Sequence, residues 1–223
     1  MGKLSIVATP IGNLEDITLR ALRTLKECGV IYAEDTRVIS KLLARYDIKK
    51  SLQRIDAVTE LKKADEIAAR LETGEHVAFV SDAGTPGISD PGARLVARVR
   101  ERLPNVKIEA IPGPSALAAA LSIAGITADA FTFVGFLPHK KGRQTALKRV
   151  LESEIPVILY ESPHRIVKLL KELEALQVPR VVVARELTKI HEEVVSGSAK
   201  EMQAYFAMHP EAVRGEFVVI VAP

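Results

Sequence analysis

The sequence predicts an α/β protein made of two α/β domains, with a ligand cleft between them. In residues 1–111, short apolar segments alternate with segments of helical periodicity, an order typical of parallel strands covered by helices on both faces. The run Pro-Gly-Pro-Ser at 112–115 then breaks the chain, and an aromatic strand and a new alternation follow it. We therefore expect domains at 1–111 and 115–223, with a binding cleft where two sheets face each other.

Composition limits the class of protein. The chain has 223 residues, 48% of them hydrophobic, which is enough to bury a large core. Its net charge of +3 neither establishes nor opposes a nucleic-acid partner. Cys28 is the one cysteine, which excludes an internal disulfide and a cysteine-rich zinc site and fits a reducing compartment. The first apolar run is interrupted by Pro10, and no run approaches membrane-spanning length, so we expect a soluble cytoplasmic protein without membrane contact.

In the first domain, four apolar runs bounded by turn residues are expected strands, and helical spacing marks the segments between them. The segment 51–60 is polar and poorly patterned. The expected strands are 4–8, 30–33, 77–80 and 106–111, and the expected helices end near Leu25, Tyr46, Leu71 and Arg102.

The second domain should open with a small apolar helix at 116–123, which Ser115 is well placed to cap. The expected strands are 131–136, 157–160, 181–184, 191–195 and 215–221, and the expected helices are 144–151, 166–176 and 200–208. The last of these strands completes the sheet.

The loop after the strand 77–80 is the first candidate binding site. Its residues 81–87 have little side-chain bulk, so a ligand can approach the backbone. The next helix should open at Ser89 or Asp90 with Pro91 in its first turn, so its amides would favour an anionic group. Asp82 adds a carboxylate where a parallel strand ends, the place where open α/β sheets bind ligands. The alternative is a tight turn with no ligand.

Five loops at strand ends carry unusual polar groups, and their coincidence is stronger evidence than any one of them. They are 9–13, 34–37, 81–85, 161–165 and 185–189. An acidic helix start such as 34–35 also complements the helix dipole without any ligand. The chain lacks the G-x-G-x-x-G, phosphate-loop and H-E-x-x-H patterns, which disfavours a nicotinamide dehydrogenase, a P-loop NTPase and a zincin. His164 and His191 are far in sequence from other soft ligands, so we expect no metal.

The basic run 139–143 and the helix after it concentrate positive charge. A surface that binds phosphate and a solvated basic face both explain such a run.

The motifs together carry a family resemblance. They are VATPIGNLEDIT at 7–18, AEDTR at 33–37, SDAGTP at 81–86, PGP at 112–114, GFLP at 135–138, YESPHR at 160–165 and ARELTK at 184–189. In this order and over almost the whole chain, they resemble the members of the tetrapyrrole methylase superfamily that methylate small-subunit ribosomal RNA.

The resemblance implies a homodimeric methyltransferase that binds S-adenosylmethionine between two α/β domains. It implies methylation of the ribose 2′-hydroxyl of a cytidine in the decoding region of 16S rRNA, within the 30S subunit. The residues it implies for the cofactor are Pro10, Gly12, Asp82, Ala83, Gly84, Thr85, Ser115, Ala116, Tyr160 and Leu187. Two features depart from the family: the segment 53–60 reads QRIDAVTE where members usually have a segment rich in His, Glu and Asn, and the chain ends at Pro223 where members usually continue into a helical extension.

A ribose hydroxyl must lose its proton to attack a sulfonium, so the site needs a base and in-line placement. The candidate bases are Asp35, Glu161, His164 and Glu186, and residue type alone does not rank them. The candidate RNA contacts are Arg37, Lys140, Lys141, Arg143, Arg165, Arg185 and Lys189. Two alternatives stay open: a C-methyltransferase of a tetrapyrrole, which would need a broad apolar trough, and a non-catalytic RNA-binding module of the same fold.

Overall fold

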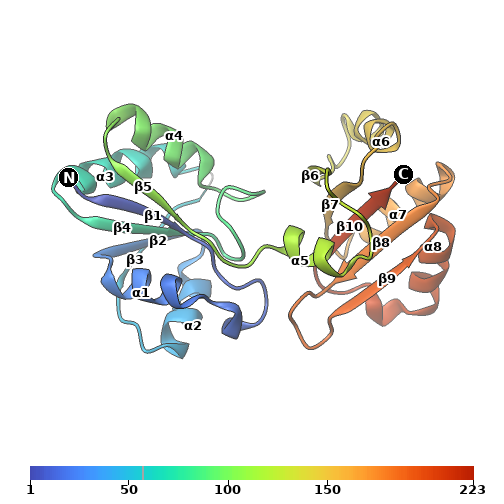
Figure 1. Ribbon diagram of the computed structural model, residues 1–223, viewed down its shortest axis with the longest axis horizontal. Helices are drawn as coiled ribbons and strands as arrows, with labels where there is room; N and C mark the ends of the chain where they lie inside the picture. The colour runs from blue at the N-terminus through green and yellow to red at the C-terminus, as the bar shows by residue number, and fades with distance from the viewer. Residues whose placement is uncertain (57) are drawn as a thin grey trace. The chain divides into compact units, whose positions relative to one another are not determined.

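The computed structural model describes residues 1–56 and 58–223 and divides into two compact units, Met1–Ser115 and Ala116–Pro223 (Figure 1). Each unit is built on one five-stranded sheet, which confirms the prediction of an α/β protein with two sheets. The expected ligand cleft between the domains stays a prediction. Of the divergent segment 53–60, Ala57 lies outside the described residues.

The sheet of the first unit is entirely parallel, with the strand order β3-β2-β4-β1-β5. Its strands are β1 (Lys3–Val7), β2 (Val30–Ala33), β3 (Ser51–Arg54), β4 (His76–Val80) and β5 (Lys107–Ile111). Strand β3 lies at the sheet edge and is half-buried or exposed along its length, so its sequence carries no apolar run by which to predict it.

Helices cover both faces of this sheet, as predicted. Helices α1 (Leu19–Glu27) and α2 (Thr36–Arg45) lie on one face, and α3 (Glu60–Glu72) and α4 (Ala93–Arg102) lie on the other (Figure 1). Strand β4 shows why the sequence is apolar from Val77 to Val80. Val77 and Phe79 pack toward α3 and α4, while Ala78 and Val80 pack toward α1 and α2.

The second unit has a mixed sheet in the order β6-β7-β10-β8-β9, in which only the β6–β7 pair is parallel. Its strands are β6 (Thr132–Phe136), β7 (Val157–Glu161), β8 (Arg180–Arg185), β9 (Glu193–Gly197) and β10 (Phe217–Ala222). The last strand, β10, completes the sheet at its centre and is buried along its whole length.

One face of the second sheet packs against α6 (Arg143–Leu151), α7 (Ile166–Ala175) and α8 (Ala199–Met208). Helix α5 (Ala116–Ile123) opens the unit at the predicted residues. Short 3-10 helices stand at Leu14–Asp16 and Pro210–Ala212. None of the described helices has the length and apolar character needed to span a bilayer.

A polar cluster interrupts the apolar strands of the first sheet. The buried Ser5 Oγ donates to Glu109 Oε1 at 2.8 Å and lies 2.9 Å from His76 Nε2. Lys3 Nζ is 3.0 Å from the same carboxylate. Burial by itself would raise the pKa of Glu109, but the hydrogen bonds from Ser5 and Lys3 outweigh it and hold the pKa at about 2.

We expect Glu109 to make the protein acid-sensitive between about pH 4.5 and pH 2. Because its pKa is lower in the folded state, the stability it contributes is fully present above the unfolded pKa and is lost as pH falls through the folded one. The contribution is about 2–3 kcal/mol. Urea unfolding across this interval should show a smaller loss for Glu109→Gln than for the wild type, and the exposed Glu72→Gln should match the wild type. If the free energy of unfolding fell equally steeply with pH in Glu109→Gln and in the wild type, Glu109 would not be the source of the acid sensitivity.

Candidate active site

The carboxyl ends of four parallel strands meet at one edge of the first sheet. Val7 of β1 pairs with Val80 of β4 and with Ile111 of β5, and Ala33 of β2 pairs with Val80. The strand order also changes direction here. The neighbours β1 and β4 are followed in the chain by β2 and β5, which lie on opposite sides of this pair. This is the edge at which open α/β sheets bind ligands.

The loops after β1 and β4 are tied together. Thr9 and Gly84 exchange two backbone hydrogen bonds of 2.9 and 3.0 Å, and Thr9 Oγ1 donates to the Ser81 carbonyl at 3.2 Å. Gly84 has φ +74°, which a residue with a Cβ rarely adopts. The buried Ser81 Oγ donates to the carbonyls of Ala83 and Gly84 at 3.3 and 3.4 Å. The small-residue loop is therefore fixed without a ligand.

A pocket of about 200 Å³ opens beside this loop. It is lined by Thr9, Pro10, Ile11, Gly12, Leu14, Val38, Ile39, Leu42, Ser81, Asp82 and Ala83. Asp82 is the one ionisable side chain in that lining. Whole-ligand pockets measure about 300–1,000 Å³, so this pocket has room for part of a larger ligand.

The sequence predicted the loop residues of the pocket and missed its apolar wall. That wall comes from Ile11 and from Val38, Ile39 and Leu42 of α2. Val38 and Leu42 are four residues apart and so lie on one face of α2. This spacing is visible in the sequence and could have predicted the apolar wall.

Two further carboxylates lie near Asp82, the acidic residue of the pocket lining. Asp82 Oδ1 accepts a hydrogen bond from the Asp35 amide at 2.8 Å, which joins the ends of β4 and β2. Burial, followed by the nearby carboxylate of Asp82, raises the pKa of Glu34 above its usual value. This corner suits a cationic group.

Asp35 forms the N-cap of α2, which is the ligand-free explanation for an acidic helix start. Its Oδ1 accepts from the Arg37 amide at 2.8 Å and from Arg37 Nε at 2.9 Å. The Arg37 side chain, followed by its amide, lowers the pKa of Asp35 to about 2. A carboxylate with so low a pKa is a weak base. The Arg37 guanidinium is in turn paired with Asp35.

The prediction that the helix after this loop begins at Ser89 or Asp90 and offers its amides to an anionic ligand is wrong. Helix α4 begins at Ala93 rather than at Ser89 or Asp90, and Gly92, with φ +134°, precedes it. The buried carboxylate of Glu60 accepts from the amides of Gly92 and Leu95 at 2.9 and 3.0 Å. Because a side chain of α3 already fills this helix terminus, the loop itself remains as the binding element.

The other implied cofactor residues are divided between the units. Thr85 Oγ1 donates to the Pro114 carbonyl at 3.3 Å, which connects the β4 loop to the segment after β5, and Ser115 ends the first unit. Ala116, Tyr160 and Leu187 belong to the second unit.

The second sheet also gathers its polar loops at one edge. Phe217 of β10 pairs with Glu161 of β7 and with Arg185 of β8, so β7 and β8 end side by side on either side of β10. Strand β6 is parallel to β7 and ends there too. The loops 137–142, 162–165 and 186–192 therefore leave the same edge.

Glu161 and Arg165 form a nearly solvent-free ion pair at this edge. Glu161 Oε1 accepts from the Ser162 amide at 2.8 Å and lies 3.1 Å from Arg165 Nε. Its Oε2 is buried and has no hydrogen-bond partner among the described residues. Arg165 also donates to the Leu137 carbonyl, and the neighbouring His164 is exposed.

Glu186 is held by a lysine rather than available as a base. Its Oε1 accepts from Lys189 Nζ at 2.8 Å and from the Glu216 amide at 3.0 Å. Burial would raise the pKa of Glu186, but Lys189 outweighs it and lowers that pKa. Lys189 also contacts Glu216 at 2.8 Å, and Arg185 pairs with Glu193 at 3.2 Å, so both cations already have internal partners.

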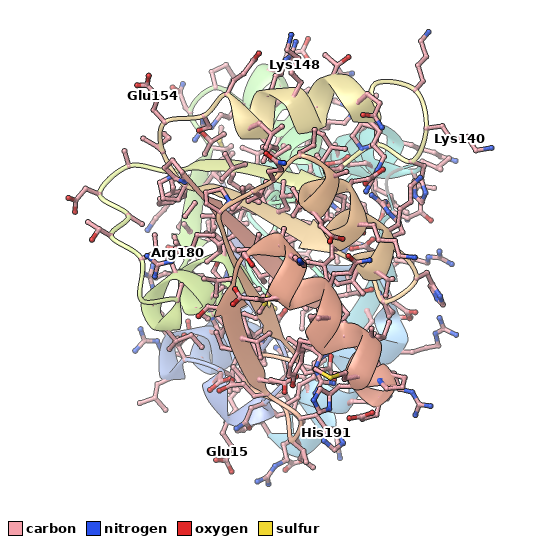
Figure 2. All side chains as sticks on the ribbon, turned by 90° about the vertical axis from the view of Figure 1, so that its right-hand side faces the viewer. Glu15, Lys140, Lys148, Glu154, Arg180 and His191 are labelled. Carbon is pink, nitrogen blue, oxygen red and sulfur yellow. The ribbon has the colours of Figure 1, made fainter. Side chains whose placement is uncertain are left out.

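The predicted RNA contacts 140–143 separate into two kinds. Lys140 and Lys141 are exposed, and Figure 2 shows Lys140 extending away from the ribbon. Arg143 is 3% exposed, binds Glu172 through Nε at 2.9 Å and Nη2 at 2.6 Å, and donates to the Pro138 carbonyl at 3.2 Å. Its burial leaves no face for a phosphate, so we revise Arg143 from an RNA contact to a structural residue.

In the part of the chain that the structure describes, no three His, Cys, Asp or Glu side chains stand together as a metal site.

Comparison with known proteins gives the family. The family model described as Tetrapyrrole (Corrin/Porphyrin) Methylases matches residues 3–203. A Thermotoga maritima protein named "Ribosomal RNA small subunit methyltransferase I" is 42% identical over 100% of this chain and 99% of that protein. A protein of the same name from Neisseria meningitidis serogroup A is 44% identical over 100% of this chain and 76% of that protein.

Solved structures agree on the fold. The crystal structure of diphthine synthase has a TM-score of 0.75 at 14% identity, covering 99% of this chain and 90% of that one. The methyltransferase CobJ has a TM-score of 0.72 at 20% identity, covering 100% of this chain and 94% of that one. With a parallel sheet, a small-residue pocket at its carboxyl edge and relatives above 40% identity over its whole length, the chain belongs to the tetrapyrrole methylase family.

Proposed function

We propose that this protein transfers a methyl group from S-adenosylmethionine to the ribose 2′-hydroxyl of a cytidine in the decoding region of 16S rRNA. The observation that carries the proposal is the pocket at the ends of β1 and β4, where a fixed small-residue loop stands beside the carboxylate of Asp82. The printed name of the relatives supports a small-subunit rRNA substrate. The reaction would take place in the cytoplasm, on the 30S subunit, with the protein as a homodimer.

The residues present fit S-adenosylmethionine. It carries a cationic sulfonium and an ammonium, which suit the carboxylate corner of Asp82 and Glu34. Gly12, Ala83 and Gly84 add no bulk, so the cofactor can approach the backbone. When bound, the cofactor supplies an electrophilic methyl group. The other proposed contacts are Pro10, Thr85, Ser115, Ala116, Tyr160 and Leu187.

The acceptor hydroxyl needs placement and loss of its proton. Asp35 and Glu186 are held as stable anions by Arg37 and Lys189, which makes them weak bases. Glu161 is also paired, through Oε1 with Arg165 at 3.1 Å, but its buried Oε2 has no hydrogen-bond partner in the described residues, so we keep it as a candidate together with the exposed His164 on the same loop. Lys140 and Lys141 would hold phosphates of the RNA.

The test is incubation with methyl-labelled S-adenosylmethionine and either 30S subunits or a tetrapyrrole. We expect label in 16S rRNA, mapped by mass spectrometry to one cytidine ribose, and none in the tetrapyrrole. Label on a tetrapyrrole carbon would replace the proposal with the C-methyltransferase alternative. Cofactor-independent binding to 30S subunits with no transfer would make the protein a non-catalytic RNA-binding module.

A further inference from the structure

An exposed aromatic side chain stands next to the exposed lysines of the second unit. Phe136, the last residue of β6, is 52% exposed although it is large and apolar. Its ring centroid is 5.8 Å from that of Tyr160, and Phe133 is 4.9 Å from Tyr160, both in edge-to-face geometry. We name Phe133, Tyr160 and Phe136 the aromatic cluster.

A β-bulge creates this cluster. Residues three apart in a regular strand point to opposite faces, so Phe133 and Phe136 should not lie together. The register between β6 and β7 shifts between Phe133 and Gly135, and Gly135 has φ +69°. Phe136 therefore pairs with Tyr160 and shares the face of Phe133. The extra residue therefore leaves the ring of Phe133 half-buried and the ring of Phe136 open to solvent.

That face is opposite the one covered by α6, α7 and α8. Leu159 packs into the core with these helices, so its neighbour Tyr160 points the other way. Strand β6 is also the edge strand of its sheet. At this edge the ring of Phe136, 52% exposed, is open to a partner.

Positive charge follows the cluster directly in the chain and is held in place. Lys140 and Lys141 stand on the loop that leaves β6. Arg165 donates to the Leu137 carbonyl and lies 3.2 Å from His139 Nε2, while Arg143 donates to the Pro138 carbonyl. Two arginines that are themselves paired with glutamates thus fix the start of the basic loop beside the ring.

We propose that the aromatic cluster and Lys140 and Lys141 form a binding surface for single-stranded RNA, in which one unpaired base stacks on Phe136 while the lysines contact flanking phosphates. Aromatic rings beside a basic track are the general means of binding single-stranded nucleic acid, because every base has a π face. The inference deepens the proposed function and rests on it, since it assigns the surface that holds the RNA around the reacting nucleotide.

The test compares Phe136→Ala with Phe136→Leu and Phe136→Tyr. We expect Phe136→Ala and Phe136→Leu to weaken binding of 30S subunits and of an oligocytidine of about 12 nucleotides by roughly tenfold to a hundredfold. Phe136→Tyr should keep wild-type affinity because it keeps a ring. The matched control is Phe131→Ala, since Phe131 is 41% exposed and precedes the other end of β6.

The contribution of Lys140 and Lys141 is measured by the salt dependence of RNA affinity. Lys140→Ala and Lys141→Ala should each lower the slope of log affinity against log salt by about 0.7, as loss of one phosphate contact on a single strand predicts. Lys200→Ala is the control, because this exposed lysine follows β9 at the opposite edge of the sheet.

Affinity for S-adenosylmethionine, measured by calorimetry, should not change in the lysine variants. In the Phe136 variants it should fall less than RNA affinity does, because Phe136 packs against Tyr160, a proposed cofactor contact. A Phe136→Ala protein that loses cofactor affinity but binds RNA normally would overturn the inference and assign the ring to the cofactor. A change from dimer to monomer with normal RNA affinity would assign it to a second copy of the chain. If the wild type methylates 16S rRNA and Phe136→Ala binds it equally well, the inference fails while the proposed function stands; if the wild type does not methylate it, the proposed function fails.

Discussion

Replacing Asp82 with alanine is expected to weaken S-adenosylmethionine binding by between tenfold and a hundredfold and to lower methylation at least as much. The substitution removes the one ionisable side chain from the pocket lining and so removes a charge-assisted contact to a cationic ligand. It also removes the acceptor of the 2.8 Å hydrogen bond from the Asp35 amide, so the ends of β4 and β2 lose a connection. Isothermal titration calorimetry measures the first effect directly.

The conservative variant Asp82→Asn separates the two losses. Its amide oxygen can still accept from the Asp35 amide, but it has no charge, so cofactor affinity should remain low while the loop stays in place. The exposed Asp129→Ala in the second unit is the control for removing a carboxylate from the surface. Wild-type cofactor affinity in Asp82→Ala would show that the pocket has been assigned incorrectly.

The second large effect is expected on stability, from Arg143→Ala. The Arg143 side chain is 4% exposed, and its guanidinium is shared between the Glu172 carboxylate and the Pro138 carbonyl. Removing the guanidinium takes away the main partner of the half-buried Glu172 carboxylate, which keeps only Lys168 at 4.0 Å, and removes a donor to the Pro138 carbonyl. We expect the free energy of unfolding in urea to fall by about 3–5 kcal/mol.

Glu172 supplies the matched control for this prediction. Lys168 lies 4.0 Å from the same carboxylate but is 61% exposed, so Lys168→Ala should cost less than about 1 kcal/mol. Arg143→Lys should be intermediate, because an ammonium cannot reproduce the bidentate contact. A stability loss for Arg143→Ala no larger than that for Lys168→Ala would mean that the arginine is not structural and would restore it as a candidate RNA contact.

Some elements could be predicted from local pattern because burial is uniform along them. Residues 77–80 of β4 are apolar on both faces because α3 and α4 cover one face and α1 and α2 cover the other. Strand β3 could not be predicted in the same way, because an exposed edge strand needs no apolar run.

The charged candidates show where residue type is insufficient. Asp35, Glu161 and Glu186 are all carboxylates at strand ends, and each is paired with a cation: Arg37, Arg165 and Lys189 respectively. Of these three, only Glu161 keeps a buried oxygen without a partner in the described residues. Arg143 and Lys141 are two residues apart in a basic run, but Arg143 opens α6 and is buried against Glu172, while Lys141 lies on the loop before the helix and is exposed. Those differences depend on partners distant in sequence, such as Glu172.

The sequence by itself determined the α/β fold with two sheets, the family, and the loops at strand ends that carry polar groups. It could do so because apolar periodicity and short motifs are local properties of the chain. Only the tertiary structure decided which groups remain available for chemistry. Glu60, 32 residues before Gly92, fills the helix terminus that looked ready for an anion, and a register shift between β6 and β7 brings Phe136 beside Tyr160. Availability is set by the neighbours that packing supplies, and packing joins residues whose separation in the chain carries no local signal.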